Sequence, residues 1–502
     1  MIKNVTEWLE ATARNLPDKV AFSDGGQSLT FAELRAQGRA CATALARRGL
    51  FKQPVAVAMG RGPHIISAFM GAAYSGNFYV PLDLEMPAYR ALKILEKVRP
   101  AACLADPEGR ELLSACGLDA GLFIPFAEAA SSAVDDGLLA AAEERQIDAD
   151  LLYVMFTSGS TGEPKGVCAC HGNVIDYINA LKNTFEPDSD TIFGQIAPFT
   201  FDASILYIYL TLQNGYTCYV IPKVCAAFAA KMVDFLNEHQ INTIYWVPTA
   251  YNIIAKSGIL AKRPPRYVRR LWFAGEVMPN SLLNIWRRAL PEAECVNLFG
   301  PTEITGTFLH YILDRDFAHD EPLPVGKPYR NVDVLILDER NRPCPAGETG
   351  ELCVRGAKVA LGYYNDPERT AEVFVQNPLN QACRDVIYRT GDFGYLNERG
   401  EIMFVGRKDH LIKHLGYRIE LGEIEATAVG LDGVELCACV YDDKNQRLVL
   451  FYSGEGEEKR VADELKSRLQ AHMWPGQVTK LAALPRTSSG KIDRANLKGK
   501  LT

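Results

Sequence analysis

Short apolar runs alternate with helical patterns along the first 400 or so residues of the chain. The run 54–59 (PVAVAM) precedes a helical pattern over 64–76, and the run 243–248 (TIYWVP) precedes another over 249–258. Strands that alternate with helices in this way form mostly parallel sheets covered by helical layers. The pattern therefore predicts a large α/β domain.

The pattern changes near Pro324. Segments 332–339 (VDVLILDE) and 350–356 (GELCVRG) are separated by Asn, Pro and Gly turns, which predicts a β-rich region. After Gly406 come an acidic helix start (GEIEATAVG), a hairpin (ELCACVYDDKNQRLVLFYS) and a charged amphipathic helix (EEKRVADELKSRLQAHM). We expect a large N-terminal domain over 1–408, built of stacked α/β subdomains and a β-rich subdomain, and a small α+β domain over 409–502.

The apolar run 151–156 predicts a buried strand that ends in the segment 157–166 (TSGSTGEPKG). Its glycines allow close approach and positive φ, and its hydroxyls and one lysine can donate to anions. A P-loop requires a glycine, four further residues and then Gly-Lys followed by Ser or Thr. Four residues separate Gly159 from Pro164, which stands where the second glycine is needed. The segment therefore predicts a phosphate-binding loop of another type, with a solvated turn as the alternative.

Composition narrows the class of protein. A chain of 502 residues exceeds one core, so at least two domains are expected. The net charge of −7 argues against a nucleic-acid or anionic-membrane surface. Thirteen cysteines at irregular spacing form neither a disulfide framework nor a zinc site. Without an apolar leader or a stretch of about 18 apolar residues, we expect a soluble, cytoplasmic protein with no membrane insertion.

Five further segments carry chemistry. Asp202 is expected just past a strand over 196–201 (IAPFTF), Glu303 behind a Gly-Pro turn, and Asp392 on a tight turn. The segments are FDAS (201–204), NLFGPTE (297–303), YRTGD (388–392), GRKDHLIKHLGYRIELGEIE (406–425) and PRTSSGKIDR (485–494). Each alone is typical of a surface loop. Together and in this order, from about Leu29 to Arg494, they resemble the adenylate-forming (AMP-binding) superfamily, in particular free-standing amino-acid adenylation enzymes of the nonribosomal-peptide and D-alanine–carrier protein ligase type.

The resemblance implies that ATP and a carboxylate form an acyl-adenylate and pyrophosphate, and that a thiol then displaces AMP. Asp392 would bind the ribose hydroxyls, Phe299 would stack on adenine where the family commonly has Tyr, and Glu303 with Thr157 or Thr161 would hold Mg²⁺. The implied ATP- and AMP-binding residues are Thr157, Ser158, Gly159, Ser160, Thr161, Gly162, Lys165, Asn297, Phe299, Gly300, Thr302, Asp392, Arg407 and Lys491.

The resemblance also implies that the small domain moves between the two half-reactions. Lys491 would be the catalytic residue, because its charge can stabilise the negative charge that develops between the carboxylate and the α-phosphate. The hinge would lie near 406–410, at Asp409. Lys413 and Gly416 would face the incoming thiol after the rotation.

In this family, a residue at the position of Asp202 pairs with the substrate α-ammonium, so an α-amino acid is favoured over an acyl chain. The pocket positions are Ala203, Leu206, Tyr245, Trp272, Ala274, Leu298, Gly306 and Thr307. They carry no formal charge, which disfavours a charged substrate side chain. Large Tyr245 and Trp272 favour a short or cyclic apolar one, although core packing explains the aromatics as well.

Resemblances to two subfamilies indicate different substrates. The chain length and the segments IAPFTFDAS, AGEVMP and LPVGKP resemble D-alanine–carrier protein ligases, but Ala274 replaces their cysteine. The pocket also partly resembles prolyl adenylation enzymes. Because no carrier-like segment follows Lys491, we expect a separate phosphopantetheinylated carrier protein as acceptor, with CoA as the alternative. The rival functions are an acyl- or aryl-CoA synthetase and a non-catalytic adenylate-binding protein.

Overall fold

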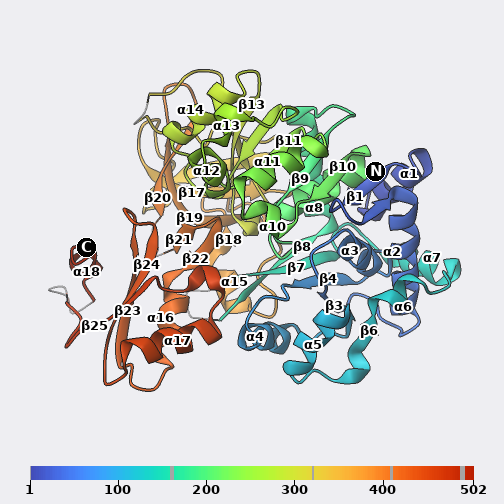
Figure 1. Cartoon of the computed structure of the whole chain (residues 1–502), viewed down its shortest axis with the longest axis horizontal. Coiled ribbons are helices and arrows are strands. Elements are labelled where there is room, and N and C mark those ends of the chain that lie inside the picture. The colour runs from blue at the N-terminus through green and yellow to red at the C-terminus, as the bar shows by residue number, and fades with distance from the viewer. Residues whose placement is uncertain (1, 159–162, 319–320, 408–410, 487–491, 502) are drawn as a thin grey trace. The chain divides into compact units, whose positions relative to one another are not determined.

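The computed structural model describes residues 2–158, 163–318, 321–407, 411–486 and 492–501. Contacts divide the chain into two compact units, each of which gathers separate stretches of sequence. Unit 1 comprises Met1–Leu84, Val98–Met155 and Gly166–Lys408, and unit 2 comprises Glu85–Lys97, Phe156–Lys165 and Asp409–Thr502. Figure 1 labels many of the helices and strands of both units and colours the chain from blue at the N-terminus to red at the C-terminus.

A six-stranded sheet lies between residues 54 and 170, in the order β6-β5-β3-β4-β7-β8. Its strands are β3 (Pro54–Ala58), β4 (Phe78–Leu82), β5 (Ala102–Ala105), β6 (Phe123–Pro125), β7 (Leu151–Thr157) and β8 (Lys165–Cys170). β3 pairs in parallel with β4 and β5, and every residue of β3 and β4 is buried. Continuous apolar runs suit interior parallel strands, so the predicted strand in 54–59 is confirmed.

The helices around this sheet begin at the N-terminus of the chain. They are α1 (Thr6–Asn15), α2 (Phe31–Ala46), α3 (His64–Tyr74), α5 (Pro107–Ala115), α6 (Phe126–Ala130) and α7 (Asp136–Arg145), with the 3-10 helix η1 (Ala120–Leu122). The helix predicted over 64–76 is α3. In the described part of the chain, no helix combines the length and the apolar character that a membrane span requires.

A nine-stranded sheet follows, in the order β15-β14-β13-β12-β11-β9-β10-β1-β2. Its strands are β1 (Val20–Ser23), β2 (Ser28–Thr30), β9 (Ile192–Gln195), β10 (Thr217–Val220), β11 (Thr243–Trp246), β12 (Arg270–Phe273), β13 (Glu294–Phe299), β14 (Leu309–Ile312) and β15 (Lys327–Pro328). From β13 to β1 the pairing is parallel, whereas β2, β14 and β15 are antiparallel. The carboxyl ends of β11, β12 and β13 therefore meet at one edge of the sheet, where α/β folds commonly bind ligands.

The helices of this region include the helix predicted after 243–248. They are α8 (His171–Phe185), α9 (Ala203–Asn214), α10 (Lys223–Ala226), α11 (Ala229–Glu238), α12 (Pro248–Lys256), α13 (Ile259–Lys262) and α14 (Asn280–Ala289), with the 3-10 helix η2 (Thr302–Ile304). α9 is buried at every residue from Ser204 to Leu212. Its side chains share one apolar cluster with residues of both sheets, such as Val55 of β3 and Phe193 of β9. A helix that is apolar all round belongs in a core, and this packing fixes the residues at the start of α9.

The β-rich region predicted after Pro324 is a five-stranded antiparallel sheet in the order β16-β17-β19-β18, with β20 paired to β19. Its elements are β16 (Val332–Leu337), β17 (Gly350–Gly356), α15 (Pro367–Val373), β18 (Phe374–Gln376), β19 (Val386–Leu396) and β20 (Ile402–Arg407). The strands predicted in 332–339 and 350–356 are confirmed as β16 and β17.

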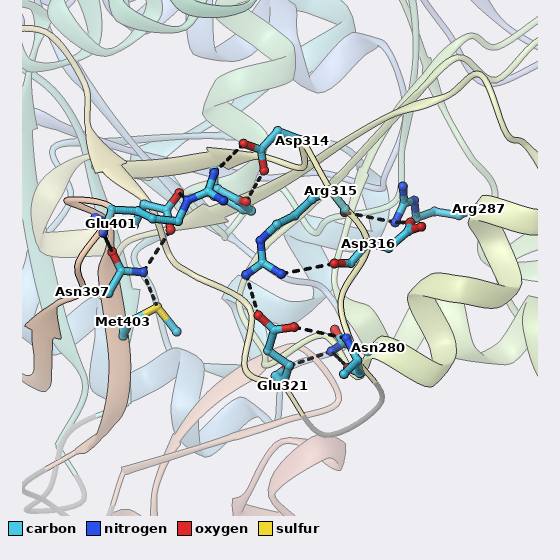
Figure 2. Close-up of polar contacts among 12 residues, drawn as sticks. Asn280, Arg287, Asp314, Arg315, Asp316, Glu321, Asn397, Glu401 and Met403 are labelled. Atoms are coloured by element: carbon cyan, nitrogen blue, oxygen red, sulfur yellow. Dashed lines mark hydrogen bonds and ion pairs between the residues drawn. The ribbon is translucent and has the colours of Figure 1, made fainter.

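Ion pairs link the turn between β19 and β20 to the loop after β14 (Figure 2). Arg399 lies 2.7 Å from a carboxylate oxygen of Asp314 and 3.2 Å from one of Glu401. In the same loop, Asp316 lies 2.7 Å from the guanidinium of Arg287 on α14. Exposed pairs contribute only about 0–1 kcal/mol each, so these contacts add little to the stability of unit 1.

Unit 2 contains the small α+β arrangement expected near the C-terminus. Its elements are α4 (Ala88–Val98), β21 (Leu411–His414), β22 (Tyr417–Glu420), α16 (Leu421–Val429), β23 (Leu436–Asp442), β24 (Arg447–Ser453), α17 (Glu458–Arg468), η3 (Ala471–Met473), β25 (Gln477–Lys480) and α18 (Arg494–Lys498). The predicted helix start, hairpin and amphipathic helix are confirmed as α16, the β23–β24 pair and α17.

A buried ion pair joins α4 to α16 inside unit 2. The guanidinium of Arg90 contacts the carboxylate of Glu423, and the two side chains are 9% and 3% exposed. A buried charge requires a partner of opposite sign, which explains why this early segment of sequence groups with the C-terminal residues. The sequence alone gave no indication of this grouping.

Candidate active site

Asp392 and Arg407 lie opposite each other on β19 and β20. Arg407 Nη1 donates to Asp392 Oδ1 over 2.6 Å, and Asp392 is only 2% exposed. The amide of Asp392 donates to Thr390 Oγ1, whose hydroxyl donates to the carbonyl of Leu352 on β17. The prediction of a tight turn at 388–392 is wrong, because this segment lies inside an 11-residue strand. Gly391, with φ +70°, absorbs a local irregularity of that strand.

Glu303 lies in η2 directly after the predicted Gly-Pro turn, and its side chain is fully buried. The hydroxyl of Tyr363 donates to Glu303 Oε1 over 2.8 Å, and the amide of Ala360 donates to the carbonyl of Glu303. The segment 360–363 thereby orients the carboxylate. Tyr363 was not predicted as a site residue, and no motif in the sequence pointed to it.

Phe299 ends β13, and its ring packs against Phe308 and Phe404 at centroid distances of 5.8 and 5.4 Å. It is 7% exposed and belongs to an apolar cluster of the β-rich region. Asn297, two residues earlier, donates to the carbonyl of Pro324 over 2.8 Å. Gly300 follows Phe299 directly. A Cβ added at Gly300 would lie 2.3 Å from the carbonyl oxygen of Gly306, so the backbones at 300 and 306 approach too closely for position 300 to carry a side chain.

The predicted amino-acid pocket positions come from neighbouring elements of unit 1. Tyr245 of β11 and Trp272 of β12 are direct register partners. Most of the set belongs to one apolar cluster: Leu206, Tyr245, Trp272, Ala274 and Leu298 are buried in it, and Ala203 packs against it. Trp272 is fully buried and donates from Nε1 to Glu294 Oε1 over 3.1 Å. Trp272 is therefore a core side chain, and its place in the pocket remains a prediction.

Asp202 immediately precedes α9 and is half-buried. The strand expected over 196–201 is wrong: β9 ends at Gln195, and Phe201 donates to the carbonyl of Pro198 in a turn. Proline has no N–H for a ladder, which favours the turn. The negative charge of Asp202 contributes to raising the pKa values of Tyr153, Tyr177 and Tyr245, although burial is the larger cause. Asp202 is therefore within electrostatic range of three buried tyrosines of unit 1, and it lies beside a helix N-terminus that stabilises an anion.

Of the residues predicted to bind phosphate in the loop 157–166, Thr157, Ser158 and Lys165 are described, and all three belong to unit 2. Ser158 Oγ donates to the carbonyl of Arg418 over 2.8 Å. Lys165 Nζ lies 2.7 Å from Glu420 Oε1, and both side chains are largely buried. Thr157 Oγ1 is buried and has no hydrogen-bond partner among the described residues. A buried hydroxyl of this kind suits an oxygen-rich ligand.

The cation that the family resemblance implies is Mg²⁺. Among the described residues, no group of three or more His, Cys, Asp or Glu is arranged to hold a metal ion. Mg²⁺ does not need such a group, because it is commonly held by one or two carboxylates together with phosphates and waters. The buried and oriented carboxylate of Glu303 in unit 1 fits that chemistry.

Several predicted residues lie outside the described residues, namely Gly159, Ser160, Thr161, Gly162, Asp409 and Lys491. The two positions expected to face the thiol are described. Lys413 is on β21, and Gly416 is in the β21–β22 turn with φ +81°. Thr302 begins η2 and is half-buried.

Two sheets with a core of parallel strands, an antiparallel β-rich sheet with a buried carboxylate on β19, and a sequence rich in hydroxyl residues after β7 are the features of an adenylate-forming enzyme. The chain belongs to the AMP-binding enzyme family, because residues 9–364 match the model of that family.

Comparison with individual proteins agrees with this assignment. The chain is 30% identical to delta-poly-L-ornithine synthetase of Acinetobacter baumannii and 34% identical to tyrocidine synthase 3 of Brevibacillus parabrevis, over 97% and 98% of its length. It spans only 36% and 8% of those two relatives. In fold, it is similar to the Vibrio cholerae adenylation domain AlmE in complex with glycyl-adenosine-5'-phosphate, with a TM-score of 0.83, 22% identity and coverage of 100% of this chain and 98% of the other. It is also similar to holo-PA1221, a protein containing adenylation and PCP domains, with a TM-score of 0.84, 24% identity and coverage of 99% and 84%.

Proposed function

We propose that this protein activates a small or cyclic apolar α-amino acid, such as alanine or proline, with ATP. The product is an aminoacyl-adenylate, and the aminoacyl group passes to the phosphopantetheine thiol of a separate carrier protein. The observation that carries the proposal is Asp202, a half-buried carboxylate at the start of the buried helix α9, beside a pocket of uncharged side chains. An α-ammonium leaving water needs such a counter-ion.

The nucleotide half of the proposal rests on Asp392, Arg407 and Glu303. Asp392 has the two oxygens that a pair of ribose hydroxyls can donate to, and Arg407 holds it from the next strand. Glu303 supplies a carboxylate for Mg²⁺, which would neutralise charge on the phosphates when bound. Lys165 would reach a phosphate only after leaving Glu420, so its ion pair competes with nucleotide binding.

The proposed transfer to a carrier protein is supported by the domain content of similar structures. Two structural neighbours contain adenylation and PCP domains. We propose residues 1–408 and 409–502 as the two functional domains, with Asp409 as the hinge and with Lys413 and Gly416 near the thiol. Loading of a phosphopantetheinylated carrier protein tests this part: Asp409→Pro should slow loading and leave adenylate formation largely intact. Equal loss of both steps would remove Asp409 from the hinge role.

Amino-acid-dependent exchange of pyrophosphate into ATP tests the activation step. The assay compares glycine, D-alanine and the proteinogenic L-amino acids with simple carboxylates such as propionate and benzoate. We expect Asp202→Ala to lower kcat/KM for the preferred amino acid by roughly 10–100-fold, because the ammonium loses a charged partner. The control is Asp234→Ala, which removes an exposed carboxylate of α11.

Turnover with a simple carboxylate and CoA, together with silence for every amino acid, would replace the proposal with an acyl- or aryl-CoA synthetase. Silence with every acid, while AMP still binds, would indicate an adenylate-binding protein without catalysis.

A further inference from the structure

Lys358 is a fully buried lysine in the turn after β17, at a position that no motif singled out. Its ammonium nitrogen lies 4.9 Å from the ring centroid of Tyr177 and 4.3 Å from that of Tyr329. Both distances are within the range of cation–π attraction. Both rings are buried, so the ammonium lies against two aromatic side chains away from solvent. We call Lys358, Tyr177 and Tyr329 the cage.

The cage adjoins the predicted amino-acid pocket directly. Lys358 Nζ donates to the backbone carbonyl of Thr307 over 2.6 Å. Thr307 Oγ1 lies 3.3 Å from the hydroxyls of both Tyr177 and Tyr329. At Gly306, an added Cβ would lie 2.6 Å from the Tyr177 ring. Lys358 and its two tyrosines therefore stand immediately behind pocket positions 306 and 307.

Two other ionisable side chains near Lys358 bear on the local charge, the acid Asp176 and the base His310. Asp176 of α8 attracts it, but Asp176 also accepts a hydrogen bond from Asn331 over 2.6 Å. His310 of β14 stacks on Tyr329, and burial together with Lys358 lowers its pKa to about 4, so it is neutral. Burial lowers the pKa of Lys358 itself to about 7.

We infer that Lys358 is a specificity-determining residue: its charge, behind Gly306 and Thr307, makes the pocket reject amino acids with cationic side chains. The inference rests on the proposed amino-acid activation. Asp202 can neutralise one ammonium, that of the substrate α-carbon. A second ammonium on the side chain would approach Lys358 with like charge and without a counter-ion, and such unpaired charge is an effective means of rejecting a ligand. The cage also fills the space behind position 306, which limits the length of any side chain.

The test separates charge from length. Pyrophosphate exchange is measured with L-ornithine and L-lysine against L-norleucine, a neutral side chain of similar length, and with glycine, alanine and proline as small substrates. In Lys358→Met, which replaces lysine with an uncharged, unbranched side chain one heavy atom shorter, the ratio of kcat/KM for lysine or ornithine to that for norleucine should rise by about tenfold or more. The matched control Lys327→Met removes an exposed positive charge on β15, and the ratio should not change.

A second measurement needs no variant. In the wild-type protein, the same ratio should rise between about pH 6.5 and pH 8.5, as Lys358 loses its proton and the substrate ammonium keeps its own. In Lys358→Met the ratio should stay constant over that range. If Lys358→Met does not fold, the ratio measured in Lys358→Gln and in the wild-type pH series still tests the inference.

A ratio that is the same in wild type and variant, and independent of pH, would overturn the inference. Failure of the proposed function looks different: the wild-type protein would then exchange pyrophosphate with no amino acid, small or large.

Discussion

Asp392 and Arg407 form a buried ion pair on neighbouring strands, so a change at either residue alters the balance of charge as well as any contact with a nucleotide. Removing one partner outright leaves the other buried without compensation, which is strongly destabilising. The informative variant therefore keeps the shape of the side chain and one oxygen that can still accept a hydrogen bond from Arg407.

Asp392→Asn is that variant. We expect kcat/KM for ATP to fall by roughly 10–100-fold, because the hydrogen bonds to the ribose lose an ionised acceptor, while KM for the amino acid changes little. Pyrophosphate exchange at varied ATP measures the effect. Asp385→Asn, near the end of β18 and bonded to Asn377, is the control. An unchanged KM and kcat for ATP would show that Asp392 does not contact the nucleotide.

The burial of the Lys358 ammonium affects the stability of the protein as well as its proposed specificity. Its folded pKa of about 7 lies below the ordinary value of 10.5. Between these values the unfolded chain binds a proton that the folded chain lacks, so the free energy of unfolding rises with pH by up to about 1.4 kcal/mol per unit. Below pH 7 both states are protonated and the full cost of burying the charge remains. Lys358→Met removes this dependence.

The Tm of Lys358→Met should therefore exceed that of the wild type most at about pH 6, and the gap should narrow by about pH 9. Thermal unfolding of both proteins across that range measures it, with Lys327→Met as the control for a lost surface charge. A gap that is constant with pH would contradict the titration of a buried ammonium.

Some of these residues could be predicted from the sequence and others could not. Asp202, Glu303 and Asp392 stand in short segments whose order along the chain is distinctive. The cage cannot be found in this way, because positions 177, 329 and 358 share no motif and no period. Only the fold brings them together, and at Lys358 nothing in the local sequence distinguishes a buried lysine from a surface one.

At the scale of elements, strands and helices with strong apolar patterns were predictable, and segments with glycine or proline were not. β3, β11, β16 and β17 match their predicted runs. The segment 388–392 was expected as a turn because it contains Gly-Asp, yet Gly391 provides a bulge within β19. The segment 196–201 is apolar enough for a strand, but Pro198 ends the ladder after β9.

The turn between β13 and η2 gives a prediction at this scale. Gly300→Ala would place a Cβ 2.3 Å from the Gly306 oxygen and 2.6 Å from Thr307 Cα, so one of the two backbones must shift. Since η2 carries Glu303, we expect kcat/KM for adenylation to fall by roughly 10–100-fold and the Tm to fall as well. Gly137→Ala, in the exposed helix α7, should leave both unchanged or slightly improved. An active, stable Gly300→Ala would show that the turn can relax.

At the scale of the whole molecule, the proposed cycle requires residues from separate parts of the chain. Lys491→Ala should lower the rate of adenylation by roughly 10²–10³, the usual loss when a group that stabilises transition-state charge is removed. Pyrophosphate exchange measures it, and Lys500→Ala, an exposed lysine nearby, is the control. Near-normal exchange by Lys491→Ala would exclude Lys491 from catalysis.

The composition of unit 2 was the least predictable property of the fold. A change of pattern after Gly406 indicated a small C-terminal module, but 85–97 and 156–165 belong to the same unit. Polar contacts between residues far apart in sequence accompany this grouping, among them the buried ion pairs of Arg90 with Glu423 and of Lys165 with Glu420. Hydrophobic patterns do not report such pairs.

The ion pair between Arg90 and Glu423 has a consequence for synthesis of the chain. The two residues are 333 positions apart. At about 5–20 residues per second, a ribosome adds Glu423 roughly 17–67 s after Arg90. During that interval α4 and the segment 156–165 hold basic side chains whose carboxylates have not yet been made. Unit 1 can begin to fold as it emerges, whereas unit 2 can close only after translation has passed residue 423, and a chaperone would find α4 accessible until then.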